Sequence, residues 1–202
     1  MSKQVTLLDS PMATSGKPTS KTEQDLLWQQ LAKLEITPPS YTLTFEARLA
    51  REQAWSFDRS LAVVEEYRKF LFLLLTCPHP VTPSEEVDAV WHLHLLYTRS
   101  YYEDLCQQIA GFVIHHQPTA GGPSEGNKFR DWYQQTLNSY AEKFGSPPKD
   151  IWPDPDKRFA NAGSGNWFNP TTHILIPRPG HGLSRWIGSQ FSSMLRVRLR
   201  MF

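Results

Sequence analysis

Residues 88–125 hold most of the side chains in this sequence that could carry chemistry. Four of the seven histidines, at positions 92, 94, 115 and 116, fall within 25 residues, and acidic side chains and a cysteine lie in the same stretch. Imidazole, carboxylate and thiolate groups are the usual protein ligands of zinc and other divalent transition metals. The segment therefore predicts either a metal or proton-transfer site, or a polar cluster that only satisfies its own hydrogen bonds.

Helical spacing limits which of these side chains can act together. At about 100° per residue, Asp88 and His92 lie about 40° apart and share one face of a helix. His92 and His94 lie about 200° apart on a helix, so they cannot both bind one ion from it. Asp88 and His92 are therefore our candidate catalytic pair, in which the carboxylate would fix the imidazole tautomer. A buried pair without any catalytic role has the same spacing.

A metal site would have to draw ligands from more than one element. His115 and His116 precede a segment rich in Gly and Pro, and Glu125 follows where the next helix is expected to begin. The helix side that carries His94 also carries aromatic residues expected to face that next helix. We therefore predict His94, His116 and Glu125 as metal ligands, with His115 as the alternative to His116. Three ligands leave an open position for a divalent transition metal such as zinc, iron or manganese.

The elements that must position these residues are predicted to be helices. Capping residues precede apolar residues at helical spacing along residues 20–145, and Ser20 with Glu23 forms a capping box. The pattern predicts an all-α bundle of about five helices, with a disordered N-terminus and an irregular basic C-terminal tail. The predicted starts are Ser20, the residue after Thr44, Ser56, Thr82 and the region of Ser124. The predicted core aromatic residues are Trp91, Tyr97, Tyr101, Phe129, Trp132, Tyr133 and Tyr140.

The chain divides by composition into three parts. Residues 1–19 are polar and predicted to be a disordered leader, residues 20–156 the helical domain, and residues 157–202 a basic tail containing Gly, Pro and Asn. The tail holds seven basic and no acidic residues, although the whole chain carries a net charge of only +1. This asymmetry predicts an acidic partner for the tail, either nucleic acid or anionic lipid. A solvated tail that only aids solubility is the other interpretation.

The sequence also bears on the compartment. The most apolar stretch, residues 70–77, is far shorter than the roughly 20 residues that span a bilayer, and the N-terminus does not resemble a signal peptide. We expect a cytoplasmic protein without a transmembrane segment. Cys77 and Cys106 lie within apolar helical patterns, so both are expected to be buried, reduced thiols.

One combined motif resembles a known family. Val87, Asp88, Trp91, His92 and His94, followed by Tyr101 or Tyr102 and by Cys106 on the same helix, are similar to the glycine-rich-domain-containing-protein-like family. The resemblance covers residues 41–153 and identifies the chain as a bacterial-type member. It implies a real domain but no reaction, because the family has no established enzymatic activity. Some plant relatives add RNA-binding-like or Gly-rich segments, and RNA binding does not carry over because this short tail lacks such a motif.

These observations favour an interaction or regulatory module that contains a buried Asp–His cluster and binds a partner protein. The motivation is that the sequence carries no complete catalytic signature, and whether it is an enzyme stays undecided. The alternative is a metal-dependent enzyme that uses the histidine-rich segments. A second alternative is a nucleic-acid or membrane adaptor that acts through the basic tail.

Overall fold

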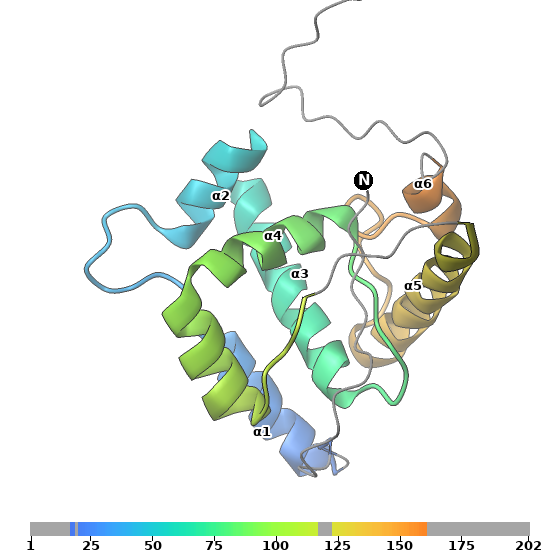
Figure 1. Ribbon diagram of the computed structural model, residues 1–202, viewed down its shortest axis with the longest axis horizontal. Coiled ribbons are helices and arrows are strands. Elements are labelled where there is room, and N and C mark those ends of the chain that lie inside the picture. Colours follow the sequence, from blue (N-terminus) through green and yellow to red (C-terminus); the bar gives the residue numbers. More distant parts are fainter. Residues whose placement is uncertain (1–16, 19, 117–122, 161–202) are drawn as a thin grey trace, which may run out of the picture. The chain divides into compact units, whose positions relative to one another are not determined.

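The computed structural model describes residues 17–18, 20–116 and 123–160, apart from the side chains of residues 123–126. Every regular element in these ranges is a helix, which confirms the predicted all-α fold (Figure 1). The chain divides into two units, Met1–Asn166 and Trp167–Phe202, and the described residues all belong to the first. The predicted disorder of residues 1–16 and the conformation of residues 161–202 lie outside the described residues. The elements are α1 (Lys21–Ala32), α2 (Phe45–Gln53), α3 (Phe57–Thr76), α4 (Glu85–Leu96), η1 (Arg99–Ala110), α5 (Pro123–Phe144) and α6 (Pro155–Phe159).

Side-chain caps begin α1, α2 and α3 at the residues that the sequence predicted, Ser20, Thr44 and Ser56. The Ser20–Glu23 capping box is present at α1, and the Ser56 hydroxyl accepts a hydrogen bond from a backbone N–H in the first turn of α3. The predicted start at Thr82 is wrong, because Ser84 caps α4 instead. The backbone N–H of Thr82 donates to the hydroxyl of Thr136 in α5, at 2.9 Å. Thr82 thus ties the linker before α4 to α5, and the cap falls to the serine two residues later.

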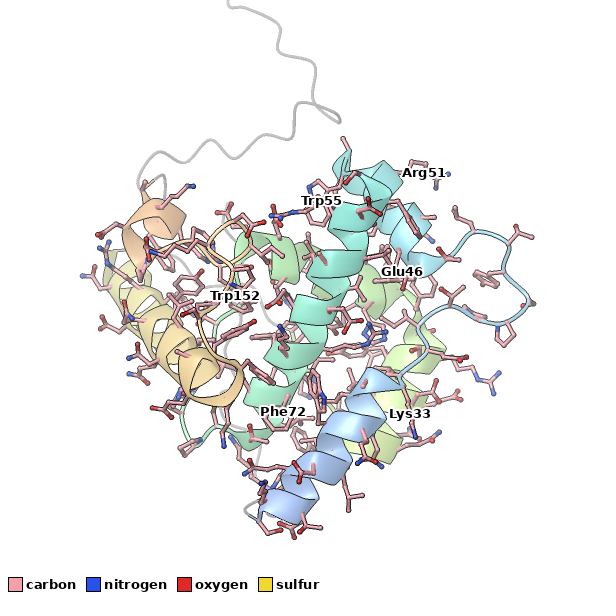
Figure 2. The ribbon with its side chains drawn as sticks, turned by 180° about the vertical axis from the view of Figure 1, so that it is seen from behind. Lys33, Glu46, Arg51, Trp55, Phe72 and Trp152 are labelled. Carbon is pink, nitrogen blue, oxygen red and sulfur yellow. The ribbon has the colours of Figure 1, made fainter. Side chains whose placement is uncertain are left out.

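Helix α3 is the centre of the packing. It contacts α1, α2, α4 and α5, and Figure 2 shows it between α1 and α5. Residues 70–75 of α3 are all buried, which explains why this stretch is apolar on every side. Of the predicted core aromatic residues, all are buried except Trp132, which is half-buried with the Lys128 ammonium 4.4 Å from its ring centroid. Both cysteines are buried and free, as predicted.

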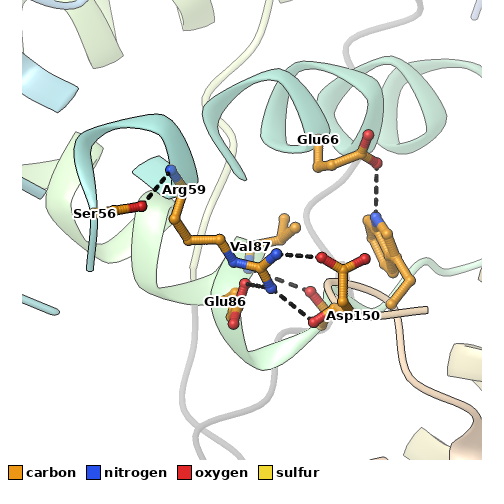
Figure 3. Close-up of polar contacts among 8 residues, drawn as sticks. Ser56, Arg59, Glu66, Glu86, Val87 and Asp150 are labelled. Carbon is orange, nitrogen blue, oxygen red and sulfur yellow. Dashed lines mark hydrogen bonds and ion pairs between the residues drawn. The ribbon is translucent and has the colours of Figure 1, made fainter. Parts of the chain in front are cut away.

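Two polar clusters fix the position of α4 and of the turn at residues 148–152 (Figure 3). Arg59 of α3 binds Glu86 in the first turn of α4, at 2.7 Å, and also binds Asp150. The buried Glu66 carboxylate accepts hydrogen bonds from the indole N–H of Trp152, the Tyr140 hydroxyl and the Lys69 ammonium, each at 2.8 Å. These bonds tie α3 both to the N-terminal turn of α4 and to α5.

The chain from Val87 to Cys106 is not one continuous helix, contrary to the prediction from the sequence. Helix α4 ends at Leu96, and Tyr97 has φ −89° and ψ 62°, outside the helical region. The chain then resumes as η1, a π-helix of 12 residues. Tyr101 and Cys106 therefore lie on a different element from His92. Among the described helices, none is both long and apolar enough to cross a membrane.

Candidate metal centre

Helix α4 presents Asp88 and His92 on one face, as the sequence predicted. The side chain of Asp88 is 12% exposed, whereas that of His92 is 39% exposed. The His92 Nε2 atom lies 3.8 Å from Asp88 Oδ2, which is within ion-pair range but too long for a hydrogen bond. Asp88 and His92 therefore lie side by side as predicted. The Asp88 carboxylate makes a shorter contact with another residue.

That shorter contact is with His116, from the segment that follows η1. The Nε2–H group of His116 donates to Asp88 Oδ1 at 3.0 Å, and only 5% of the His116 side chain is exposed. Its ring lies edge-on to Trp91, with the ring centroids 4.6 Å apart. The ring centroids of His92 and His116 are 4.4 Å apart. One carboxylate and two imidazoles thus converge at a partly exposed position.

The three ligand atoms of Asp88, His92 and His116 all lie within 4.8 Å of one another. A carboxylate with two imidazoles suits zinc, and it is also the ligand set of non-haem iron sites. The site would draw two ligands from α4 and one from the segment after η1. Two of its residues, Asp88 and His116, are 28 positions apart in the sequence, so no short sequence motif predicts the site.

His94 lies in a different environment and does not join this cluster. Its Nδ1 atom is 2.9 Å from the Tyr67 hydroxyl and its Nε2 atom is 3.2 Å from the Ser100 hydroxyl. Ser100 donates its own proton to the backbone carbonyl of Glu35, so it must accept from Nε2–H of His94, and Nδ1 must accept from Tyr67. Both ring nitrogens are therefore engaged within the protein, and His94 is fully buried.

Burial also keeps His94 neutral. It lowers the pKa of His94 to about 3, helped by the positive charge of Arg68. Of the predicted ligand set of His94, His116 and Glu125, the structure does not bring His94 and His116 together. His94 is committed to Tyr67 and Ser100, and the side chain of Glu125 lies outside the described residues. His115, the predicted alternative, is exposed.

A buried cation lies near the candidate ligands. Arg158 of α6 donates from Nε to the Pro83 carbonyl and from a terminal nitrogen to Glu85 Oε1, both at 3.2 Å. Burial lowers the pKa of Arg158, and the negative charges of Glu85 and Asp88 oppose this shift. Residue 158 was expected to belong to the basic tail, yet only 2% of its side chain is exposed.

Sequence reasoning missed one further serine–histidine pair. Nδ1–H of His79 donates to the Pro80 carbonyl, so Nε2 accepts from the Ser139 hydroxyl, and both distances are 2.8 Å. Ser139 lies inside α5, where backbone N–H groups are bonded to the preceding turn and cannot stabilise an oxyanion. We interpret the pair as a structural tie between the α3–α4 linker and α5.

Comparison with known proteins identifies relatives of the chain. Residues 39–135 match the family model described as UCP032817-like. Glycine-rich domain-containing protein 2 of Arabidopsis thaliana is 25% identical over 177 residues, which cover 68% of this chain and 21% of that protein. Glycine-rich domain-containing protein 1 of the same plant is 30% identical over 88 residues, covering 41% of this chain and 11% of that protein. No solved structure matches the chain.

These matches confirm the resemblance to the glycine-rich-domain-containing-protein-like family that the motif around His92 predicted. The assignment to a bacterial type stays a prediction. The chain spans about a fifth or less of the length of the two plant relatives. Neither relative's name states a reaction, so the chemistry must be argued from the site.

Proposed function

We propose that this relative of the glycine-rich domain-containing proteins binds one divalent transition metal ion through Asp88, His92 and His116. The observation that carries the proposal is the convergence of three ligand atoms within 4.8 Å of one another, from two segments of the chain. Asp88 and His116 are joined by a hydrogen bond and both are largely buried, so the site is mostly organised before an ion arrives.

The distances are close to those that coordination requires. With metal–ligand bonds of about 2.1 Å, ligand atoms in a tetrahedral site lie about 3.4 Å apart. The distance of 3.0 Å from His116 Nε2 to Asp88 Oδ1 and that of 3.8 Å from His92 Nε2 to Asp88 Oδ2 lie on either side of this value, each to a different oxygen of the carboxylate. An ion would replace the proton between His116 and Asp88. The neutral ring would then carry its proton at Nδ1. Binding would weaken at low pH, because protons compete with the ion for the same nitrogen atoms.

Three protein ligands leave at least one position for water or another ligand. A zinc-type ion lowers the pKa of its bound water and polarises carbonyl or phosphoryl oxygens, so a Lewis-acid role follows from this arrangement. The exposed side of His92 gives an outside ligand access to the ion. The predicted metal-dependent enzyme thus becomes our leading proposal, with zinc, iron or manganese as the candidate ions and the substrate open.

The experiment is metal analysis of protein purified without a histidine tag, followed by zinc titration and thermal unfolding. We expect about one equivalent of metal, and at 100 times Kd an ion adds about 2.7 kcal/mol of stability, or about 5–10 °C in Tm. His92→Gln and His116→Gln should each abolish this shift. His115→Gln is the matched control, because His115 is adjacent and exposed.

The outcomes separate the possible ligand sets. If His115→Gln rather than His116→Gln removes the metal, the alternative ligand is the right one. If the wild type holds less than about a tenth of an equivalent, and no ion raises its Tm, the metal proposal fails, because a ligand that binds the folded state must stabilise it.

A second candidate function, binding of a partner protein, is favoured by a groove of about 510 Å³ between residues 35–41 and 96–100. Leu96 and Tyr41 line this groove and are 64% and 56% exposed. Large exposed apolar side chains beside a groove are typical of interaction surfaces. The Leu96→Glu variant should lose such a partner and keep the zinc-induced Tm shift. Retention of every co-purifying partner by this variant would argue against the groove.

The adaptor role of the basic tail and the cytoplasmic location stay predictions. Deleting residues 161–202 tests the adaptor role, because this deletion spares α6 and the buried Arg158. An adaptor would lose salt-sensitive binding to RNA, DNA or anionic vesicles in this truncated form. Unchanged binding would exclude the tail as the contact.

A further inference from the structure

The segment that carries His116 is held in place by side chains of the π-helix η1. The Tyr101 hydroxyl donates to the Ile114 carbonyl at 2.7 Å, and the Ile114 N–H donates to Cys106 Sγ at 3.4 Å. Ile114 is almost fully buried, and it lies two residues before His116. Both backbone polar groups of one residue thus depend on two side chains of η1, which fixes the path of the chain toward the ligand.

The Tyr101 hydroxyl also holds Trp91, whose ring packs against His116. Tyr101 accepts a hydrogen bond from the indole N–H of Trp91 at 2.9 Å, and Trp91 is fully buried against the His116 ring. A single hydroxyl therefore links three parts of the structure: α4, which carries Asp88 and His92, η1 itself, and the segment that carries His116.

The π-helical geometry explains how two residues five positions apart can both form hydrogen bonds with the backbone of Ile114. In an α-helix, Tyr101 and Cys106 would differ by about 140° and point to different sides. In a π-helix, hydrogen bonds join residues i and i+5, so side chains five apart lie on the same side of the helix. The wide turn of η1 therefore places both side chains over Ile114. Regular α-helix over the same residues would lose one of the two contacts.

We propose that Tyr101 and Cys106 are positioning residues for the metal ligand His116. The π-helical turn places both side chains within hydrogen-bond distance of Ile114. The inference rests on the proposed metal site, but it also makes a claim about the metal-free protein. Without the Tyr101 hydroxyl, the Ile114 carbonyl and the Trp91 indole both lose their partner, and His116 loses its fixed approach to Asp88.

The test compares Tyr101→Phe with Tyr133→Phe. Tyr133 is an equally buried tyrosine whose hydroxyl also donates to a backbone carbonyl, that of Pro153 at 2.8 Å, away from the proposed ligands. Both variants lose one bond to a backbone carbonyl, and Tyr101→Phe also loses the bond from Trp91. The free energy of unfolding of each variant is therefore measured beside its zinc affinity, so that a general loss of stability is recognised. We expect Tyr101→Phe alone to weaken zinc binding about 10- to 100-fold, the usual effect of removing a group that orients a ligand. The visible spectrum of bound cobalt should also change in Tyr101→Phe alone.

The cysteine supplies a second comparison. Cys106→Ser keeps an acceptor for the Ile114 N–H and should retain zinc affinity, whereas Cys106→Ala should weaken it. Cys77→Ala is the matched control, because Cys77 is the other buried free cysteine. Equal zinc affinity in Cys106→Ser, Cys106→Ala and wild type would remove Cys106 from the proposal.

Failure of the inference can be told apart from failure of the metal site. If the wild type binds no metal, nuclear magnetic resonance of the metal-free protein still reports the Nε2–H group of His116, which should be protected in wild type and Tyr133→Phe and exchange faster in Tyr101→Phe. If the wild type binds zinc, and Tyr101→Phe matches Tyr133→Phe in affinity and cobalt spectrum, Tyr101 does not position His116. Unchanged exchange of this Nε2–H group in metal-free Tyr101→Phe would likewise exclude a positioning role for Tyr101.

Discussion

His94 should make the protein lose stability in mild acid. Its pKa is lowered to about 3 by burial, from about 6.5 in the unfolded chain. The unfolded state therefore binds a proton first, so the stabilisation is complete above about pH 6.5 and is lost as the pH falls toward 3. Because His94 is fully buried, screening by solvent does not reduce the effect.

The size of this loss follows from the two pKa values. Between pH 7.5 and 5, His94 alone should lower the free energy of unfolding by about 2 kcal/mol, and the full loss near pH 3 is about 4 kcal/mol. Domains of this kind have total stabilities of about 5–15 kcal/mol, so this residue would dominate the early part of acid unfolding.

The assay is urea unfolding at several pH values with a chelator present, on wild type and His94→Gln. Glutamine keeps a donor and an acceptor for Ser100 and Tyr67 and cannot be protonated. The stability difference between the two proteins should shrink by about 2 kcal/mol from pH 7.5 to 5. His92 and His116 are present in both proteins, so their titration cancels. A difference that stays constant with pH would refute the reasoning, whatever the variant's own loss of stability.

Three further outcomes follow from the described contacts. Glu66→Gln should cost about 2–3 kcal/mol in urea unfolding because the buried carboxylate accepts three hydrogen bonds, whereas Glu65→Gln, at the surface, should cost less than about 1 kcal/mol. Gly145→Ala should cost about 1 kcal/mol in the same assay, because φ is 81° at that position after α5. Zinc affinity, measured by competition with a chelator, should fall as the pH is lowered, because protons compete with the ion for the imidazole nitrogen atoms.

The parts of the fold that depend on neighbours in sequence were predictable. The capping box at Ser20 and the N-cap at Ser56 depend on residues three positions away, and both are confirmed. The apolar run within α3 is buried on all sides, as its composition suggested. The sequence predicted Thr82 as the N-cap of α4, but Ser84 caps the helix. The reason is a hydrogen bond from the Thr82 backbone to Thr136, which lies 54 residues further along the chain and is not a neighbour in sequence.

The candidate site was predictable only in pieces. The Asp88–His92 spacing and the availability of His116 follow from the sequence, but their convergence does not. The path of residues 111–116 decides it, and that path is fixed by bonds from Tyr101 and Cys106 to Ile114. The break between α4 and η1 carries no Gly or Pro in the sequence, so a continuous helix was the natural expectation.

Two histidines two residues apart on α4 thus lie in opposite environments. The side that bears His94 faces α3, where the Tyr67 hydroxyl and burial hold the imidazole neutral and bonded at both nitrogens. The side that bears His92 is partly exposed beside Asp88 and His116. A metal ion needs an imidazole nitrogen that can be freed at low cost, and a buried imidazole with two internal partners does not offer one. The angle of about 200° between the two residues, which ruled out shared ligation in the sequence, is what lets one helix both build the core and carry the site.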